Sequence, residues 1–281
     1  MNPAARLLAL ALLAGSMAAF AASAPPSRDG GDILQRFHQG LAEPGCDDAS
    51  PRWRHHYARA AQRLADDDET ALALFGYVLD RMLTAGLPSE YALIPFVETR
   101  YHPDARSRGG PAGLWQFTAG TARLHGLRVR GGIDERMSAA ASTDAAIAHL
   151  ARLHRLFGGR WRDVAMAYNA GEGALRASRR KGGRPLSGIT RSYPNKLHAI
   201  ACLFDAEADR PRWRNAVARP VARLAARTLP AGTRDLRRWA RDQGLDPALV
   251  RALNPGWHPG SRQVVAPVAG EAGRTAPGEA N

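Results

Sequence analysis

The helical pattern between Pro51 and Ala85 is the feature that most constrains the fold of this chain. Apolar residues recur there at the spacing of one helix face, at Leu72, Leu74, Phe75, Val78, Leu79 and Met82. The acidic run from Asp67 to Glu69 suits the positive end of a helix that starts nearby, and Gly86 ends it. Alternating runs of Val, Ile, Thr and Tyr are scarce elsewhere in the chain, so we expect an all-α fold.

Further segments of helical pattern are bounded by Ser, Thr, Pro or Gly. We expect helices over Glu90–Thr99, over Thr118–Gly126, from Ser142–Thr143–Asp144 to Gly158–Gly159, and from Trp161 to the break at Gly171. Together with the first segment they define one helical domain over residues 51–210. A domain of that size can bury a sizeable core.

The composition changes near Arg210–Pro211. Residues 211–227 resemble a polar connector, and residues 228–268 predict a compact β-α-α-β unit. Within that unit we expect a short extended piece at residues 229–233, helices around Leu236–Gln243 and Pro247–Leu253, and a strand at Val264–Val265. The composition of residues 269–281 predicts a disordered tail.

The first 24 residues have the features of an export signal. A single Arg6 precedes the apolar stretch Leu7 to Phe20, and Ala22–Ser23–Ala24 suits signal peptidase. A membrane anchor is less favoured, because the run is short and rich in Ala. We therefore expect a soluble mature protein of roughly 255 residues in the periplasm or cell envelope, with residues 25–50 as an N-terminal arm.

The two cysteines, Cys46 and Cys202, lie far apart and lack the spacing of a metal site or a CxxC motif. In an oxidising compartment they could form a disulfide or remain two free thiols, and the sequence leaves both open. The histidines His102, His125, His149 and His154 show no metal-ligand grouping. We expect neither a metal nor a cofactor.

The formal charge is +13, and +12 without Arg6 of the leader. A basic exported chain favours anionic partners such as wall polymers, lipid headgroups or nucleic acid. Most of the arginines are scattered, and the compact basic run from Arg176 to Arg184 contains glycines that suggest a solvated loop. Charge therefore favours an acidic polymer without identifying it.

Glu98 is the one acid within the segment PFVETRYHP, which closes an apolar run from Glu90 to Ile94. If Glu90–Thr99 is helical, Tyr91, Ile94 and Pro95 share its face. Desolvation and the negative end of the helix would both raise the pKa of Glu98, as a general acid requires. The alternative is a surface carboxylate paired with Arg100 or Arg106.

Two later segments offer the polar and aromatic groups that carbohydrate sites use. The glycine-rich turn from Ser107 to Phe117 delivers Gln116 between Trp115 and Phe117, and the segment Ala167–Gly171 places Tyr168 and Asn169 at a helix break. We interpret Trp115 and Phe117 as mainly structural residues and Tyr168 as mainly functional.

These motifs together resemble the soluble lytic transglycosylase family, glycoside hydrolase family 23, which has the goose-type lysozyme fold. The matching pieces are E-x-x-Y-x-P-x-A-x-S from Glu98 to Ser107, GLWQF from Gly113, and AYNAGEG from Ala167, in the family's order and spacing. The resemblance implies an enzyme that cleaves the MurNAc-β-1,4-GlcNAc bond of peptidoglycan without water and leaves 1,6-anhydroMurNAc ends. Glu98 would act first as acid and then as base.

The same resemblance assigns the other site residues. Ser107, Gln116, Tyr168 and Asn169 would bind glycan or orient Glu98, and Tyr193 matches a late family tyrosine whose hydroxyl approaches the acid. The sequence departs from the family pattern at Ile189, where a Glu is common, at Pro194, where a Val is usual, and at Pro111, which replaces an Ala. The first of these departures weakens the assignment of Tyr193.

The C-terminal unit resembles a divergent LysM module, a type that binds N-acetylglucosamine polymers and follows the catalytic domain in some members of the family. Its usual Gly-Asp-Thr is reduced to Gly232–Thr233, so the unit either binds glycan or is retained as a structural cap. The expected partners are peptidoglycan glycan strands, with envelope assembly proteins as further candidates. Nucleic acid is not expected as a partner, nor a membrane span after removal of the signal.

A hydrolytic muramidase is the alternative enzyme, and it would normally need a second carboxylate near Glu98. The candidates are Asp104, Asp134, Glu135, Asp163 and Glu172. We expect Asp134 to be a helix cap or ion-pair member and Glu172 to belong to a helix start, so no second acid stands out. A noncatalytic peptidoglycan-binding scaffold is the alternative outside the enzymes.

Overall fold

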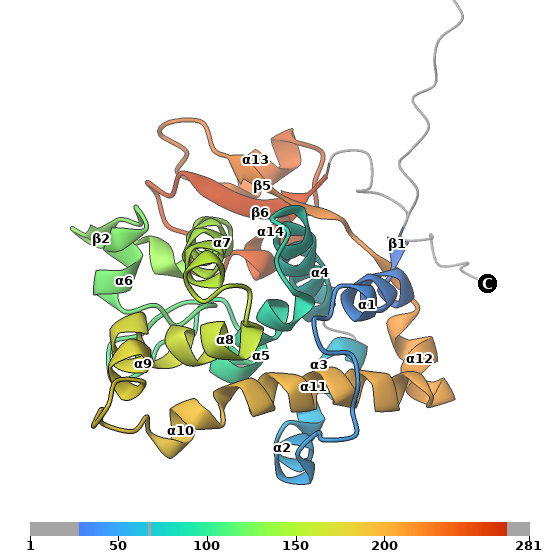
Figure 1. The fold of residues 1–281 in the computed structure, drawn as a ribbon. Coiled ribbons are helices and arrows are strands. Elements are labelled where there is room, and N and C mark those ends of the chain that lie inside the picture. Colours follow the sequence, from blue (N-terminus) through green and yellow to red (C-terminus); the bar gives the residue numbers. More distant parts are fainter. Residues whose placement is uncertain (1–27, 67–68, 269–281) are drawn as a thin grey trace, which may run out of the picture.

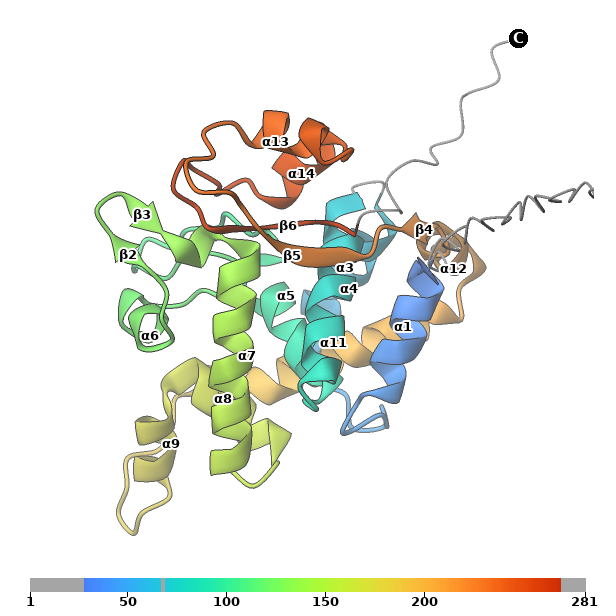
Figure 2. The same cartoon turned by 90° about the horizontal axis from the view of Figure 1, so that it is seen from above.

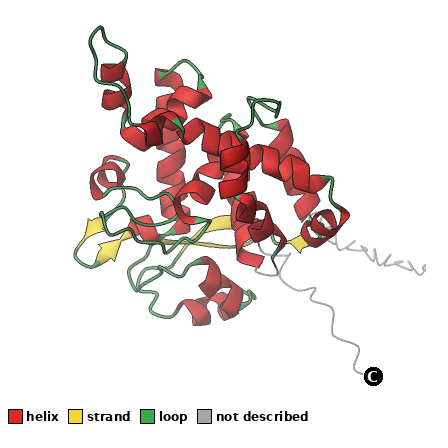
Figure 3. Cartoon of the chain, turned by 90° about the horizontal axis from the view of Figure 1, so that it is seen from below, coloured by secondary structure: helices red, strands yellow, loops and turns green. Residues whose placement is uncertain are grey.

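A computed structural model describes residues 28–66 and 69–268, and the expected signal peptide and C-terminal tail lie outside these residues. The all-α prediction is confirmed, because helices make up most of the fold (Figures 1 and 3). The described strands pair antiparallel in three small sheets, β1 with β4, β2 with β3 and β5 with β6. No helix within the described ranges has both the length and the hydropathy needed to cross a bilayer.

The segment from Pro51 to Ala85 forms three helices rather than one continuous pattern. They are α2 (Pro51–His56), α3 (Ala58–Ala65) and α4 (Glu69–Thr84). The chain leaves helical geometry at Tyr57, where φ is −99°, and at Asp66, which is extended. All six positions of the predicted apolar face lie in α4, where they are buried.

Residues 25–50, expected as an arm, contain a core helix. Asp29 begins α1 (Gly30–Gln39) with a reciprocal capping box that involves Asp32. Ile33 and Phe37, four positions apart, are fully buried in the main core. This first helix is thus part of the helical body, and the segment after it is covalently tied by a Cys46–Cys202 disulfide.

The helices that follow surround the centre of the domain. They are α6 (Ala119–Leu124), α7 (Ala139–Leu156), α8 (Trp161–Ala170), α9 (Glu172–Ser178), α10 (Gly188–Arg191) and α11 (Tyr193–Ala208), with β2 (Val129–Arg130), β3 (Ile133–Asp134) and the 3₁₀ helix η2 (Glu135–Met137) between α6 and α7. Helix α7 starts earlier than predicted because Ser138 caps it and alanines fill its first turn. Helix α11 runs across the lower part of the view in Figure 1, with α2 below it.

The prediction that residues 211–227 form a polar connector is wrong. It forms α12 (Pro211–Val217), then β4 (Pro220–Val221), which pairs with β1 (Arg28–Asp29), and then most of β5. Trp213 and Val217 lie four positions apart, so they share a helix face and enter the main core. This spacing was already visible in the sequence, but the many arginines around it make the segment resemble an exposed one.

The C-terminal unit has the predicted β-α-α-β order. It consists of β5 (Leu224–Thr228), α13 (Leu236–Asp242), α14 (Pro247–Leu253) and β6 (Gln263–Pro267). The first strand ends just before the extended piece expected at residues 229–233, whose Pro230 and Gly232 form a turn instead. The β5–β6 sheet lies across α4 and α7, with α13 on its far side (Figure 2).

Both faces of this small sheet are buried. Val264 and Ala266 join a core formed with α13, whereas Val265 joins the main core of the helical domain. Ionic contacts add to this packing, because Arg262 pairs with Glu135 of η2 at 3.0 Å. The unit is therefore packed onto the helical domain rather than tethered to it.

Candidate active site

Glu98 lies in the last turn of a short helix that differs from the predicted one. The segment forms a 3₁₀ helix, η1 (Ser89–Leu93), followed by α5 (Ile94–Thr99). Pro95 has no N–H to continue a helix from the preceding residues, and it sits in the first turn of α5, where prolines are accepted. The predicted helix over Glu90–Thr99 is thus split, and Tyr91 turns toward α7, where its hydroxyl lies 3.1 Å from Nδ1 of His154.

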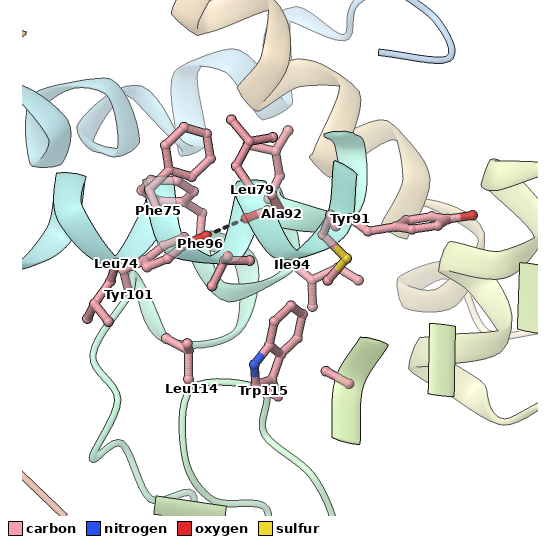
Figure 4. Packing of buried hydrophobic residues seen from close by; sticks show 14 of the residues in the cluster. Leu74, Phe75, Leu79, Tyr91, Ala92, Ile94, Phe96, Tyr101, Leu114 and Trp115 are labelled. Atoms are coloured by element: carbon pink, nitrogen blue, oxygen red, sulfur yellow. Dashed lines mark hydrogen bonds between the residues drawn. The ribbon is translucent and has the colours of Figure 1, made fainter. Parts of the chain in front are cut away.

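The turn after Glu98 is held by a buried tyrosine. Arg100 and Tyr101 both adopt the left-handed conformation, with φ of 54° and 62°, which is costly for residues other than glycine. The hydroxyl of Tyr101 donates to the carbonyl of Ala92 over 2.7 Å (dashed line in Figure 4), and its ring packs on Phe96 with centroids 4.5 Å apart. These contacts fix the direction in which α5 ends, and so position Glu98.

Tyr193 is the closest partner of the Glu98 carboxyl group. Its hydroxyl donates to Oε1 of Glu98 over 2.5 Å, and the tyrosine itself is buried at the start of α11. Burial raises the pKa of Glu98 above its usual value, although the hydrogen bond from Tyr193 and the charge of Lys196 act in the opposite direction. The carboxyl group is thus biased toward its protonated form.

The structure does not contain the alternative arrangement, in which Glu98 pairs with Arg100 or Arg106 at the surface. Among the described residues, no Arg lies within ion-pair distance of Glu98, and Arg106 pairs instead with Asp134 at 3.3 Å. Glu98 is half-buried rather than fully enclosed. A half-buried acid with a raised pKa is suited to protonating a bound ligand.

The glycine-rich turn is braced from behind by η2. Gly113 has a φ of 76°, and a Cβ there would overlap the carbonyl of Arg136. The guanidinium of Arg136 donates to the carbonyls of Gly110 and Phe117, at 2.8 and 3.0 Å. Glycine is therefore required for close approach as well as for conformation.

Gln116 and Ser107 meet on this turn. The Ser107 hydroxyl donates to Oε1 of Gln116 over 2.7 Å, and Nε2 of Gln116 donates to the carbonyls of Ala105 and Gly113. The Gln116 amide thus fastens the turn in this structure, while Ser107 is exposed.

Tyr168 and Asn169 lie at the end of α8, as expected. The Tyr168 hydroxyl donates to the carbonyl of Trp115 over 2.6 Å, and Oδ1 of Asn169 accepts from Thr190 of α10 over 2.9 Å. Burial and the nearby Glu98 both raise the pKa of Tyr168. The residue thus joins the glycine turn to the surroundings of the acid, whereas Trp115 and Phe117 are buried, as predicted for structural residues.

The candidate second carboxylates are largely committed elsewhere. Four of the five form ion pairs away from Glu98: Asp134 with Arg136, Glu135 with Arg128 and Arg262, Asp163 with Arg160 and Arg179, and Glu172 with Arg152. Asp134 also caps η2, and Glu172 is the first residue of α9, as expected. Within the described part of the chain, no second carboxylate shifts the pKa of Glu98.

Sequence reasoning missed a group of residues near Glu98. Tyr57, at the α2–α3 junction, has its pKa raised to about 12 by burial and by the charge of Glu98. Trp53 of α2 and Lys196 of α11 lie beside it, with the Lys196 ammonium 4.9 Å from the Trp53 ring centroid. These residues lie outside the short motifs, and only the fold brings them to the acid.

One cluster has the donor types of a metal site. Ligand atoms of Glu43, Asp48 and His198 lie within 4.8 Å of one another. However, the Arg162 guanidinium donates to both Glu43 oxygens, at 2.7 and 2.8 Å, and so already supplies the positive charge. We assign no metal to this cluster, nor to His125 and His149, which bond to each other at 2.9 Å.

Comparisons with known proteins find a family model and several relatives that match parts of this chain. The family model described as Transglycosylase SLT domain matches residues 84–186. The chain is 30% identical over 158 residues to membrane-bound lytic murein transglycosylase D of Escherichia coli K12, covering 53% of this chain and 35% of that protein. It is 42% identical over 83 residues to peptidoglycan transglycosylase gp16 of Escherichia phage T7, covering 29% of this chain and 6% of that protein.

Solved structures of two lytic transglycosylases are also similar. The 70 kDa soluble lytic transglycosylase of Escherichia coli matches with a TM-score of 0.42 and 17% identity, over 57% of this chain and 32% of that chain. An inactive mutant of lytic transglycosylase Slt from Pseudomonas aeruginosa matches with a TM-score of 0.38 and 19% identity, over 66% and 39%. The chain spans about a third of the length of the curated relative from Escherichia coli K12.

Proposed function

We propose that this protein is a peptidoglycan lytic transglycosylase, because residues 84–186 match the family model described as Transglycosylase SLT domain. It cleaves the MurNAc-β-1,4-GlcNAc bond without water and leaves a 1,6-anhydroMurNAc end. The observation that carries the proposal is the half-buried Glu98, whose pKa is raised by burial and whose Oε1 accepts from Tyr193. A protonated carboxyl group of this kind can donate to a glycosidic oxygen.

The reaction needs one carboxyl group used twice. Glu98 donates its proton to the glycosidic oxygen as the bond from that oxygen to C1 of MurNAc breaks, and the GlcNAc chain leaves as an alcohol. The C6 hydroxyl of the same MurNAc then attacks C1, and its proton returns to Glu98. The Tyr193 hydroxyl donates to the carboxylate that exists between these steps, and so stabilises it.

The environment of Glu98 favours this route over hydrolysis. A hydrolase commonly holds its water or stabilises charge with a second carboxylate about 5 to 9 Å from the acid. Four of the five candidates are paired with arginines elsewhere, and the groups acting on Glu98 are a tyrosine and a lysine. The C6 hydroxyl of MurNAc is held by the substrate itself, so it requires no second carboxylate to position it as the nucleophile.

The remaining site residues would hold the glycan. Ser107 is exposed at the glycine turn and Asn169 is exposed at the end of α8, so each can bond sugar hydroxyl or acetamido groups. Gln116 keeps Ser107 and the turn in place, and Tyr168 joins this turn to α8. If Gln116 gave up its hydrogen bonds within the turn when glycan binds, its side-chain amide could bond to the glycan instead.

The setting proposed for this activity is the cell envelope, reached through a cleavable signal over residues 1–24. The partners are peptidoglycan strands and, in remodelling, envelope assembly proteins. The C-terminal unit would act as a divergent LysM-like module that binds glycan or caps the domain. N-terminal sequencing of the protein from a periplasmic fraction tests the export proposal, with a start near Ala24–Pro25 as the expected result.

Digestion of purified sacculi tests the function directly. The mature protein, Glu98→Gln and the matched control Glu172→Gln are incubated with sacculi, and the released muropeptides are analysed by mass spectrometry. We expect anhydro ends from the wild type and from Glu172→Gln, and at least about a hundredfold less product from Glu98→Gln. Products with reducing ends would indicate a muramidase, whereas binding without release by any variant would indicate a scaffold.

A further inference from the structure

Lys196 is a charged residue at the site that the proposed reaction does not use. It lies in the first turn of α11, three residues after Tyr193. Its ammonium group lies 4.9 Å from the centroid of the Trp53 ring and 5.8 Å from that of the Tyr193 ring. Because Tyr193 bonds to Glu98, these contacts hold the cation close to the catalytic acid.

Within the fold, the Lys196 charge has only its two ring contacts and the nearby Glu98 to favour it. Burial lowers the pKa of Lys196, which means that the surroundings disfavour its charge, and Glu98 only partly compensates. The first turn of a helix is also the positive end of the helix dipole, where a cation is disfavoured. Among the described residues, no partner forms a hydrogen bond or ion pair with the Lys196 ammonium group, whereas the Lys196 backbone N–H donates to the carbonyl of Ser192.

The neighbourhood of Lys196 is basic and aromatic. The Arg52 guanidinium lies over Trp53 as well, 5.0 Å from its ring centroid, and Arg54, His55 and His56 follow on the same short helix. Trp53 is half-buried, whereas His55 and His56 are exposed. A cation on an aromatic platform at the edge of a site is suited to an anionic group on the ligand.

The proposed substrate carries such a group at the right place. The muramoyl sugar at the scissile bond has an ether substituent on O3 that ends in a carboxylate. In a strand without peptides this is the lactyl carboxylate itself, and in a peptide-bearing strand the lactyl group is an amide and the carboxylates belong to the peptide. Either form presents negative charge on the sugar whose glycosidic bond Glu98 would cleave by protonating its oxygen.

We propose that Lys196, held on the Trp53 ring, binds a carboxylate on the O3 substituent of the muramoyl unit at the scissile bond and thereby sets the preference for charged strands. This inference rests on the proposed function, because it names a contact of the same substrate. It makes Lys196 a specificity residue, distinct from the proton transfers of Glu98. The source of the carboxylate, lactyl or peptide, is decided by the test.

The experiment compares strands that differ only in this charge. Soluble glycan strands with and without peptides are each used as prepared and after conversion of their carboxylates to methylamides. The value of kcat/KM is measured for the wild type, Lys196→Gln, Lys196→Arg and the control Arg210→Gln. Arg210 is exposed just after α11, outside the C-terminal unit, and its substitution changes the net charge equally.

We expect Lys196→Gln to lose about tenfold in kcat/KM on charged strands and little on their methylamides. Lys196→Arg should retain most of the preference, and Arg210→Gln should match the wild type. A loss confined to peptide-free strands identifies the lactyl carboxylate, and one confined to peptide-bearing strands identifies the peptide. An equal loss on charged and methylamidated strands, or no loss on any, would overturn the proposal.

Binding to an inactive protein separates this inference from the proposed function. Affinities for the same strands are measured with Glu98→Gln and with Glu98→Gln/Lys196→Gln. If the wild type turns over no strand, the proposed function fails whatever the binding results are. If turnover is normal but the second variant binds charged strands as tightly as the first, only the role of Lys196 fails.

Discussion

Tyr193 donates its hydroxyl hydrogen to Oε1 of Glu98 across 2.5 Å, although 95 positions separate the two residues in the sequence. The bond joins the end of α5 to the start of α11. It lowers the pKa of Glu98, while the burial that the same packing imposes raises that pKa more strongly. Burial therefore favours the protonated form of Glu98, while the hydrogen bond from Tyr193 stabilises the ionised form.

Replacing Tyr193 by Phe removes the hydrogen bond and keeps the ring. The pKa of Glu98 should then rise further, because the group that favours its ionised form is gone. Since the proposed reaction needs protonated Glu98, the fall in kcat/KM at high pH should move to higher pH. The loss of one hydrogen bond to a charged intermediate should also lower kcat about tenfold.

The pH profile of Tyr168→Phe is the control for this prediction. Its hydroxyl donates to the carbonyl of Trp115 and not to Glu98, so the substitution removes a buried hydrogen bond of another kind. We expect reduced thermal stability with an unshifted profile. Identical profiles for wild type and Tyr193→Phe would contradict the role assigned to the hydrogen bond.

Glu98 should reduce the stability of the folded protein near neutral pH. Its pKa in the fold is raised above the value of about 4.3 in an unfolded chain, so ionisation favours unfolding. Glu98→Gln, which can still accept from Tyr193, should therefore unfold at a higher temperature than wild type above the folded pKa. The difference should shrink as pH falls through that pKa and vanish below about pH 4. Calorimetry across this range measures it, and a variant less stable than wild type at pH 7 would refute the raised pKa.

Much of the helical domain was predictable because local signals set it. Ser, Pro and Gly at the helix ends and apolar faces such as that of α4 depend only on residues nearby in sequence. Pro95 carried the signal that α5 cannot continue from η1, and the prediction of one helix over Glu90–Thr99 ignored it. Trp213 and Val217 likewise carried a helical spacing that charged neighbours concealed.

The surroundings of Glu98 were less predictable, because they depend on contacts between distant segments. Trp53 meets Lys196 across more than a hundred positions, and Glu43 meets Arg162 similarly. The motif Gly113–Phe117 predicted that Gln116 matters, whereas its bonds to Ala105 and Gly113 became visible only in the fold. Sequence patterns specify helix faces, but the pairing of faces is a property of the whole chain.

Gly113→Ala should be strongly destabilising. The new Cβ would overlap the carbonyl of Arg136, and φ at this position is 76°. Overpacking and backbone strain together should lower the free energy of unfolding by about 3 kcal/mol or more. Gly110→Ala is the matched control, because its φ is 99° and its Cβ would meet no atom within 4 Å. Urea unfolding of the two variants separates the steric cost from the conformational one. Equal losses would show that the contact with Arg136 contributes nothing.

Loss of the Cys46–Cys202 disulfide should lower the free energy of unfolding by about 3 to 5 kcal/mol, because the bond closes a long loop, with a sequence separation of 156. The double variant Cys46→Ala/Cys202→Ala and reduced wild type should agree within about 1 kcal/mol, since both remove the same constraint. Chemical denaturation with and without reductant measures the change. A loss in the double variant without any effect of reductant on the wild type would indicate cavity formation at buried Cys202 rather than loss of the cross-link.

The C-terminal unit and the helical domain should unfold in one transition. Leu224, Leu253 and Val265 of the unit belong to the main core, and Arg262 pairs with Glu135. Neither part can therefore unfold without exposing apolar surface of the other. Trp239 and Trp257 lie in the unit, so their fluorescence, measured in a variant whose four other tryptophans are replaced by Phe, can be compared with far-ultraviolet circular dichroism of the whole chain. Coincident melting curves are expected, whereas an earlier fluorescence transition would mean that the unit is an independent module, as a tethered glycan-binding domain would be.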